Sequence, residues 1–380
     1  MQGNDSSAEA ARDSKSALPA KRFEGRQATC YTPRSSRKSK PVANIYSVAK
    51  TARVSVATVS AVVNKSAYVS PQLRSRVESA IQKLGYEPNL MARSLAVRKS
   101  HMLGMIVPDI ANPFWPEVVR GAEDKAHELG YTLLLSNGDD APAKEELYLR
   151  LFLAKRVDGI ILTKAPGRPM KPEIALALQK AHIPLTLLLR VQKGLQGDAV
   201  LLDDKEGAFE AVTHLLRLGY RRIGVIAGSN AVSTSRRRLE GYRQAHKEWG
   251  VALDPSLVGV GNFRIDSGYA AGRDLLKKRP EAVFISNYLM AVGFMQALRQ
   301  YQLRCPQDVA IVTCDDHPWL DSFTPRLTTV NFPKYQVGAE AARVLVDRLT
   351  TRDRPIETVQ LKSTLSIRES CGYSLRALAV

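Results

Sequence analysis

Two stretches near residue 50 carry apolar residues at helical spacing. In the first, the residues at i, i+3, i+4 and i+7 are Ile45, Val48, Ala49 and Ala52. In the second, which follows the potential helix cap Ser55, they are Val59, Val62 and Val63. Both patterns are typical of amphipathic helices. Two short helices joined by a tight turn predict a helix-turn-helix, whose second helix enters the major groove of DNA.

A third helix is expected after Ser70 and Pro71, which suit the N-cap and the first helical position. Gly85 would end this helix. Its apolar face would consist of Leu73, Val77, Ala80, Ile81 and Leu84. Three such helices can bury a common core. The pattern alone also suits helices that bind no DNA, so the charge and the rest of the chain must decide.

From Met102 onward the pattern changes to short, apolar, β-rich runs. These runs are residues 103–109, 131–137, 157–163, 183–189, 199–203, 221–228, 256–261, 281–286 and 309–315. Helical stretches lie between them, at 115–130, 142–155, 205–219, 236–249, 267–279 and 289–301. This alternation predicts an α/β fold with doubly wound parallel sheets, in which a ligand would bind outside the carboxyl ends of the strands.

The length of 380 residues suggests two or three domains. No apolar run approaches the ~20 residues that span a bilayer, and the start of the chain lacks the apolar core of a secretory signal. We therefore expect a cytoplasmic protein without a membrane partner. Cys30, Cys305, Cys314 and Cys371 are scattered, which argues against a disulfide framework and against a zinc site. No metal and no cofactor is expected.

The net charge of +18 is concentrated at one end of the chain. Residues 1–100 hold 18 Lys and Arg against 6 Asp and Glu, a surplus of 12. Such a surplus is typical of a module that binds a polyanion, most simply DNA. An anionic membrane surface is the competing partner, but no basic amphipathic helix with bulky aromatic residues accompanies the charge.

Both ends of the chain are predicted to be tails that lie outside the folded domains. Residues 1–42 are rich in Ser, Ala, Lys and Arg and predict a disordered extension, in which 34–40 could either add phosphate contacts or have no role. Residues 371–380 have only Leu375 and Leu378 at helical spacing. Because that is too short for the coiled coil of a stable tetramer, a homodimer is favoured.

Several segments together carry a resemblance to a known family. They are 45–64 (IYSVAKTARVSVATVSAVVN), 69–89, 92–95 (ARSL), 107–124, 155–162, 214–228, 238–245 (RLEGYRQA), 305–316 and 324–333 (TPRLTTVNFP). In this order and spacing, the chain resembles the lactose-repressor family of bacterial transcription regulators over roughly residues 44–370.

The resemblance implies a headpiece, a hinge and an effector-binding core. The headpiece would span 43–86, and the hinge helix or linker 87–100. The core, 101–370, would be a dimerising pair of lobes like those of periplasmic binding proteins. One lobe would comprise 101–200 with 325–334, and the other 201–324 with 335–370. The family controls DNA binding with a small molecule held between such lobes.

The resemblance also implies DNA contacts. Phosphate-binding donors would be Tyr46, Ser55, Thr58, Ser60 and Asn64. Val56 and Ala57 match the variable base-reading pair and, being apolar, would either meet thymine methyl groups or pack by shape. Arg53 replaces the usual turn Gly, at a cost of about 1 kcal/mol if the turn keeps positive φ. Ala61 replaces an Arg that reads guanine, which removes about 1–3 kcal/mol of base discrimination.

The hinge would contribute Asn89, Ala92 and Leu95 to the DNA interface. In the family this helix forms on the operator, pairs with its dimer mate, and inserts a Leu into the minor groove, the position held here by Leu95. The alternative is a plain interdomain linker, with Leu95 in a small hydrophobic cluster.

The effector cleft is expected where strands end. The resemblance and the strand ends place six residues there: Phe114, Trp115, Arg238, Phe263, Asn287 and Asp315. The family's usual Asn-Asp pair is Asn287-Tyr288 here, and the residues before Asp315 also depart from the family pattern. The effector could be a sugar, a sugar acid or a nucleobase. Arg236 and Arg237 would favour an acidic ligand if they faced the cleft, or else form a solvated helix face.

An enzyme is not expected. The neighbouring carboxylates Asp203-Asp204 and Asp315-Asp316 lie side by side in sequence, and such pairs rarely converge on one substrate. No partnered Ser and His and no phosphate-binding glycine motif follows a strand. A solute-binding protein would suit residues 101–370 alone, and a nucleoid protein would suit the basic end alone. The whole chain predicts a dimeric repressor that binds a pseudo-palindromic operator under effector control.

Overall fold

The computed structural model describes residues 43–64, 66–86 and 99–376. The chain divides into two compact units, Met1–Pro88 and Asn89–Val380, and each is described separately. The expected disordered extension, the hinge positions 87–98 with Asn89, Ala92 and Leu95, and residues 377–380 lie outside the described residues.

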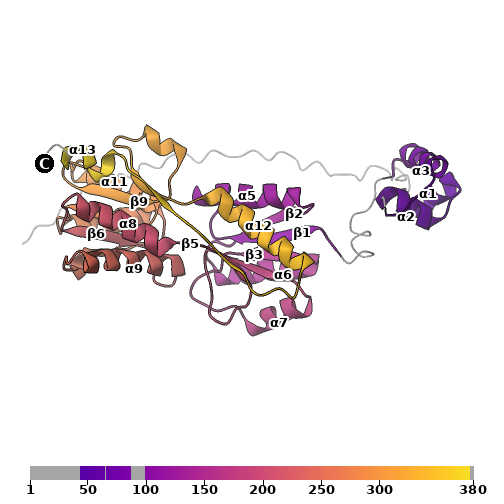
Figure 1. Cartoon of the computed structure of the whole chain (residues 1–380), viewed down its shortest axis with the longest axis horizontal. Coiled ribbons are helices and arrows are strands. Elements are labelled where there is room, and N and C mark those ends of the chain that lie inside the picture. Colours follow the sequence, from indigo (N-terminus) through magenta and orange to yellow (C-terminus); the bar gives the residue numbers. More distant parts are fainter. Residues whose placement is uncertain (1–42, 65, 87–98, 377–380) are drawn as a thin grey trace, which may run out of the picture. The chain divides into compact units, whose positions relative to one another are not determined.

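The first unit contains the three expected helices, α1 (Ile45–Ala52), α2 (Val56–Asn64) and α3 (Pro71–Leu84). They form the headpiece (Figure 1). Its core consists of Val48, Ala49, Ala52, Val59, Val62, Val69, Val77 and Ala80. This matches the predicted apolar stripes. Gly85 ends α3 in the left-handed conformation, with φ of 59°.

The second unit begins with a sheet of six parallel strands in the order β11-β5-β4-β3-β1-β2. The strands are β1 (Met102–Val107), β2 (Thr132–Asn137), β3 (Gly159–Leu162), β4 (Leu185–Leu188), β5 (Asp198–Leu202) and β11 (Thr358–Leu361). α5 (Phe114–Glu128) and α12 (Lys334–Thr350) cover one face, while α6 (Pro142–Lys155) and α7 (Pro172–Lys180) cover the other. We call this the first lobe.

The second lobe repeats this arrangement with the strand order β12-β10-β9-β8-β6-β7. Its strands are β6 (Ile223–Ala227), β7 (Val258–Val260), β8 (Ala282–Ile285), β9 (Ala310–Cys314), β10 (Thr328–Asn331) and β12 (Thr364–Ser366). β12 alone runs antiparallel to its neighbour. α8 (Asp204–Arg217) and α9 (Ser233–Glu248) cover one face, and α10 (Ile265–Leu276) and α11 (Tyr288–Gln300) the other.

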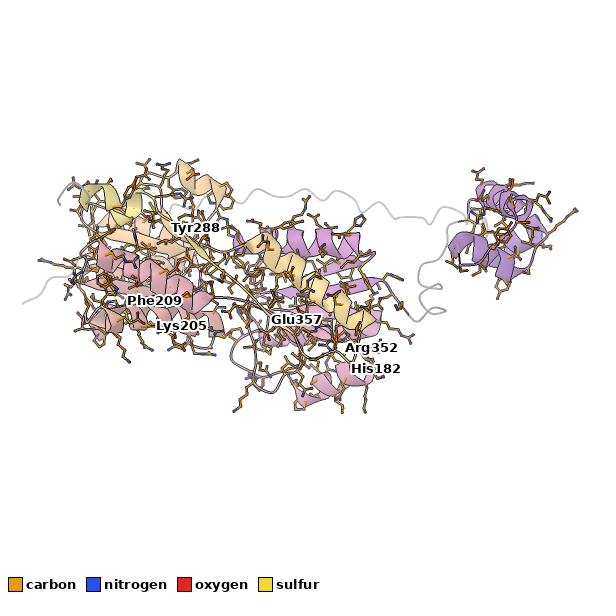
Figure 2. All side chains as sticks on the ribbon, viewed as in Figure 1. His182, Lys205, Phe209, Tyr288, Arg352 and Glu357 are labelled. Carbon is orange, nitrogen blue, oxygen red and sulfur yellow. The ribbon has the colours of Figure 1, made fainter. Side chains whose placement is uncertain are left out.

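Short helical turns complete the second lobe, at Pro255–Leu257, Pro318–Ser322, Glu369–Cys371 and α13 (Tyr373–Arg376). The predicted α/β fold class with doubly wound sheets is confirmed. In Figure 2, side chains fill both lobes, with Lys205 and Phe209 on α8 of the second and His182, Arg352 and Glu357 on the first. None of the helices in the described ranges is both long and apolar enough to cross a membrane.

The chain crosses between the lobes three times, and this corrects the lobe boundaries that the sequence suggested. We expected residues 325–334 in the first lobe and 335–370 in the second. Instead, β10 pairs with β9 in the second lobe, α12 covers the first sheet, and β11 extends that sheet beside β5.

The physical reason is the close contact between α5 and α12. A Cβ atom on Gly338 would lie 1.8 Å from the carbonyl oxygen of Val118, and one on Gly121 would lie 1.9 Å from that of Tyr335. Glycine at both positions lets the two helix backbones touch, which fixes α12 to the first lobe. The apolar face of α12 was visible in the sequence, but an apolar face does not say which sheet it covers.

Candidate functional site

The turn of the headpiece keeps positive φ although it lacks glycine. Arg53 has φ of 51° and ψ of 50° and ends α1. The Arg76 guanidinium of α3 donates hydrogen bonds to the carbonyl oxygens of Ala52 (2.6 Å) and Arg53 (3.1 Å). Charged donors on these free carbonyls stabilise the helix end, which offsets part of the strain of a left-handed Arg.

The polar residues proposed to bind phosphates lie on α1 and α2 and at the turn before α2. Ser55 caps α2, since its Oγ accepts from the backbone N of Thr58 at 3.1 Å. Its hydroxyl also lies 2.9 Å from that of Thr58. Asn64 Nδ2 donates to Ser60 Oγ at 3.1 Å. The Tyr46 side chain is 71% exposed. These groups hold one another in place and leave Tyr46 free to reach a partner.

The two residues expected to read bases differ in exposure. Ala57 is exposed and Val56 is half-buried against the headpiece core. Ala61, which replaces an expected Arg, is also half-buried. The first turns of α2 therefore present a small apolar surface with no side chain able to donate to a base edge at these three positions.

In the second unit, one cleft between the lobes collects all six residues expected to bind the effector. It holds about 680 Å³ of atom-free space, a volume that includes space open to solvent. The lining from the first lobe is Pro108, Asp109, Asn112, Phe114, Trp115, Asp139, Asp140, Leu189 and Arg190. The lining from the second lobe is Thr234, Arg238, Asn262, Phe263, Arg264, Asn287 and Asp315.

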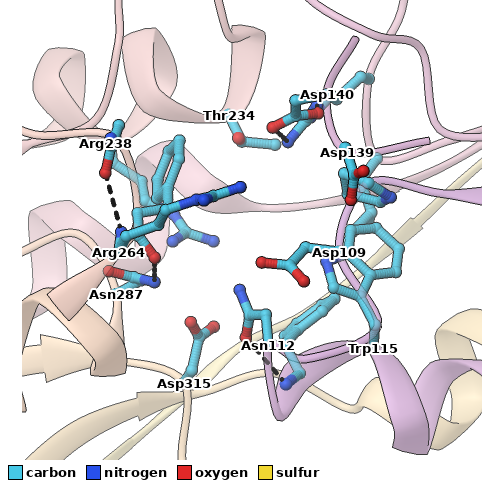
Figure 3. Close-up of a pocket in the computed structure, with 16 residues that line it drawn as sticks. Asp109, Asn112, Trp115, Asp139, Asp140, Thr234, Arg238, Arg264, Asn287 and Asp315 are labelled. Carbon is cyan, nitrogen blue, oxygen red and sulfur yellow. Dashed lines mark hydrogen bonds and ion pairs between the residues drawn. The ribbon is translucent and has the colours of Figure 1, made fainter. Parts of the chain in front are cut away.

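Most of these residues follow the carboxyl end of a strand, as expected for doubly wound sheets. In Figure 3, Arg238, Asn287 and Asp315 face Asp109, Asn112 and Trp115 across the cleft. Phe114 and Trp115 are both buried, with ring centroids 5.2 Å apart in an edge-to-face arrangement. They give the first lobe an apolar wall beside polar groups.

The aromatic side chain of the second lobe is held in a strained backbone. Phe263 has φ of 67°, which costs of order 1–3 kcal/mol for a residue other than glycine. Its carbonyl accepts a hydrogen bond from Asn287 Nδ2 at 3.0 Å. A Cβ atom on Gly228 would lie 2.1 Å from Phe263 Cζ, so the ring occupies space that only glycine leaves open. Such strain is typical of functional sites.

Asn287 and Arg238 are tied to the second lobe. Asn287 caps α11, since its Oδ1 accepts from the backbone N of Met290 at 3.0 Å. Arg238 is 6% exposed, and its Nε bonds Asp204 Oδ1 at 2.8 Å. Its Nη1 donates to the carbonyl oxygen of Ser286. The guanidinium also lies over the Phe332 ring, 4.9 Å from its centroid.

Asp315 is the one cleft carboxylate that is both buried and incompletely bonded. Its Oδ1 has no hydrogen-bond partner within the described part of the chain. Burial raises the pKa of Asp315, and Arg238 and Lys334 oppose that shift. A buried acceptor without a partner costs about 1–3 kcal/mol, and a ligand donor at this oxygen would remove that cost. Its φ of 74° adds backbone strain at the same point.

Two further acidic residues of the cleft, Asp139 and Asp140, were missed from the sequence. Asp139 bonds Lys144 and Asn137, and the hydrogen bond from Lys144 is the main reason that the pKa of Asp139 is lowered. Asp140 pairs with Arg190 at 2.5 Å. Their position after β2 was a usable signal, because strand ends meet at the cleft.

Arg236 and Arg237 do not line this cleft. Both are exposed on α9, which agrees with a solvated helix face and removes them as a reason to expect an acid in the cleft itself. Among the residues that the structure describes, no group of three or more His, Cys, Asp and Glu side chains could hold a metal ion.

Comparisons with known proteins agree with both units. A family model described as bacterial regulatory proteins, lacI family, matches residues 44–89, and a periplasmic binding protein-like domain matches residues 212–371. The ribose operon repressor of Escherichia coli (strain K12) is 36% identical over 333 residues, which are 87% of this chain and 100% of that protein.

Two solved structures are similar along the same span. A lac repressor dimer bound to operator and an anti-inducer has a TM-score of 0.76 at 26% identity, covering 87% of this chain and 99% of that one. A transcriptional regulator CelR in complex with cellobiose has a TM-score of 0.66 at 32% identity, covering 86% and 99%.

Proposed function

The chain belongs to the lacI family of bacterial regulatory proteins, and from this we propose that it represses transcription under the control of a small molecule bound between its lobes. As a member of this family it is a DNA-binding transcription regulator and not an enzyme. The relatives match it across the headpiece as well as the lobes, so a solute-binding protein without a regulatory role is not favoured.

On the DNA side, a homodimer would place two headpieces on the half-sites of a pseudo-palindromic operator. Phosphate contacts would come from Tyr46, Ser55, Thr58, Ser60 and Asn64, and Val56 and Ala57 would meet bases. Because neither residue can donate a hydrogen bond through its side chain, we expect thymine methyl groups at the bases they face.

The hinge would complete this interface. Asn89, Ala92 and Leu95 are proposed to contact DNA, with Leu95 inserted in the minor groove between the two half-sites. Since its target is chromosomal DNA, we place the protein in the cytoplasm.

For the effector we propose a sugar bound through the six cleft residues. The observation that carries this is the Oδ1 of Asp315, which has no partner in the described part of the chain and could accept a hydrogen bond from a sugar hydroxyl. Phe114, Trp115 and Phe263 would pack against the apolar faces of a sugar ring. Among the relatives, one represses a ribose operon and another is bound to cellobiose, which supports the same class of ligand.

Effector binding would be coupled to DNA binding through the three segments in which the chain crosses between the lobes. These segments join β5 to α8, β10 to α12 and β11 to β12. Lys334, the first residue of α12, bonds the carbonyl oxygen of Asp316 in the second lobe and pairs with Glu117 of the first at 3.1 Å. Ser363 N donates to Asp203 Oδ1 at 2.8 Å. This bond links the segment between β11 and β12 to the segment between β5 and α8. An effector that favours one arrangement of the lobes would shift DNA affinity only by its differential affinity for that arrangement.

Selection of operator sequences from a random duplex pool tests the DNA half of this proposal. We expect an enriched pseudo-palindrome with thymines facing Val56 and Ala57. Calorimetric screening of monosaccharides and disaccharides tests the other half. A pool without any enriched sequence would reject the repressor function, and a panel without any binding sugar would reject the effector class.

A further inference from the structure

A second cavity lies beside the effector cleft and is lined by basic side chains. It holds about 660 Å³ of atom-free space, partly open to solvent, and runs from loops of the first lobe to the start of α9 in the second. Its basic residues are Lys164, Arg168, Arg190, Lys193 and Arg236. No Asp or Glu is among its described lining residues.

Two of these five charges are already neutralised. Lys164 pairs with Glu145 at 2.8 Å, and both side chains are buried. Arg190 pairs with Asp140 at 2.5 Å. Each of these two cations is therefore paired with a carboxylate that lies outside the cavity lining.

The other three cations have no carboxylate partner within the described part of the chain. Arg168 and Lys193 are exposed on the loops after β3 and β4, and Arg236 donates only to the carbonyl oxygen of Asn230. Like charges gathered in one cavity repel each other unless an anion lies between them. Three such cations exceed what a single carboxylate of a ligand would balance.

The start of α9 adds donors to the same cavity. α9 has no acidic residue in its first turn and no side chain that caps its N-terminus. Ser233, its first residue, lines the cavity, and the Ser233 Oγ is buried without a hydrogen-bond partner in the described ranges. Free backbone N–H groups at the start of a 16-residue helix favour a bound anion, most of all a phosphate group.

The cavity and the cleft are built from neighbouring residues. Arg190 lines both. On α9, Ser233 and Arg236 line the cavity, whereas Thr234 and Arg238 line the cleft. The two spaces therefore adjoin at Arg190 and along the first turns of α9.

We propose that the effector is a sugar phosphate, whose phosphate group is bound in this cavity by Arg168, Lys193, Arg236 and the start of α9. The inference rests on the proposed function, because it adds a substituent to the sugar of the cleft. Charge-assisted hydrogen bonds from guanidinium and ammonium groups to phosphate are roughly twice as strong as neutral hydrogen bonds, so the phosphate would contribute much of the affinity.

Isothermal titration calorimetry of the full chain tests the site without DNA. The probes are inorganic phosphate and a panel of matched pairs, each a monosaccharide, its phosphate ester and its sugar acid, at constant ionic strength. The test variant is Arg168→Gln/Lys193→Gln/Arg236→Gln. The matched control is Arg237→Gln. Arg237 is exposed and adjacent to Arg236 in sequence, but it lines neither the cleft nor the cavity.

In the native chain and in the control, one phosphate ester should bind about tenfold or more tighter than its parent sugar and than inorganic phosphate. In the triple variant this advantage should fall below about twofold, while the parent sugar binds as before. Equal affinity for ester and parent sugar would overturn the proposal, as would an advantage that survives the triple substitution or is matched by the sugar acid. Operator selection with the same samples shows separately whether the repressor function stands.

Discussion

Arg238 Nε lies 2.8 Å from Asp204 Oδ1, and both side chains are almost fully buried, although Arg238 lines the cleft between the lobes. The pair belongs wholly to the second lobe, since Asp204 starts α8 and Arg238 lies on α9. Burial raises the pKa of Asp204, and the charge of Arg238 opposes this shift. The residue expected to hold the effector therefore also keeps a buried carboxylate paired.

Arg238→Ala should for this reason lower the stability of the protein and also abolish its response to the effector. Leaving a buried carboxylate unpaired costs about 3–5 kcal/mol of unfolding free energy, and the effector response should be lost. Denaturant unfolding and effector titration of operator binding measure the two effects. Arg237→Ala, on the exposed face of the same helix, should change stability by less than about 0.5 kcal/mol and leave the response intact. A responsive Arg238→Ala variant would show that the effector binds elsewhere.

Asp315→Asn should weaken sugar binding and change how stability depends on pH. Because the folded protein raises the pKa of Asp315, the unfolded chain loses this proton first as pH rises above the ordinary value of 3.8. Ionisation of Asp315 thus lowers stability progressively as pH rises through its raised pKa. Asn does not titrate, so the variant should gain stability relative to the native chain toward neutral pH.

Thermal unfolding of both proteins across that pH range measures this difference. Below pH 3.8 the two proteins should differ least, because Asp315 is protonated in the folded and the unfolded chain. Sugar affinity should fall about tenfold or more, since a carboxylate acceptor is replaced by a neutral one. A variant that is less stable at neutral pH, with unchanged sugar affinity, would contradict the role of this oxygen.

Gly228→Ala tests whether the Phe263 ring contributes to sugar binding, because Gly228 contacts this ring but does not itself line the cleft. Its new Cβ would meet the Phe263 ring at 2.1 Å, so the ring must leave its place. We expect sugar affinity to fall about tenfold with little loss of DNA affinity. Phe263→Ala removes the ring directly, and in that background Gly228→Ala should have no further effect on affinity. Additive effects of the two changes would mean that Gly228 acts by another route.

Arg53→Gly should stabilise the headpiece by about 1 kcal/mol, because glycine adopts positive φ without a clash. The amide of Val54 donates to the carbonyl oxygen of Ala49 at 3.0 Å and reports on this turn. Its hydrogen exchange should slow in Arg53→Gly. Arg53→Val, which places a β-branched residue at positive φ, should accelerate the same exchange. Faster exchange in the glycine variant would show that the side chain of Arg53 stabilises the turn more than its φ strains it.

The features that the sequence predicted correctly are those that depend on the spacing of apolar residues along a short segment. The stripes Val48 to Ala52 and Val59 to Val63 gave the headpiece, and apolar runs gave strands of both sheets, because burial imposes a period that can be read directly. The cleft residues Phe114 and Asp315 were found because strand ends meet there and the family shares those motifs.

What the sequence did not give depends on partners that lie far apart along the chain. The lobe assignment of α12 rests on the contact of Gly338 with Val118, which no period reveals. Arg236 could be placed on a helix, but not in a cavity with Arg168 and Lys193, because that requires the position of two other loops. Specific pairings of this kind need the tertiary structure.

Control of DNA binding by the lobes is tested by one linked titration of the full-length protein. Fluorescence anisotropy would give its affinity for a selected operator and for a scrambled duplex at moderate salt, each with and without the sugar or sugar phosphate that binds best. We expect the affinity for the operator to exceed that for the scrambled duplex by a factor of about 10³ or more. The effector should change operator affinity by the same factor by which the operator changes effector affinity. Equal affinity for both duplexes, with every candidate effector and without any, would contradict the account.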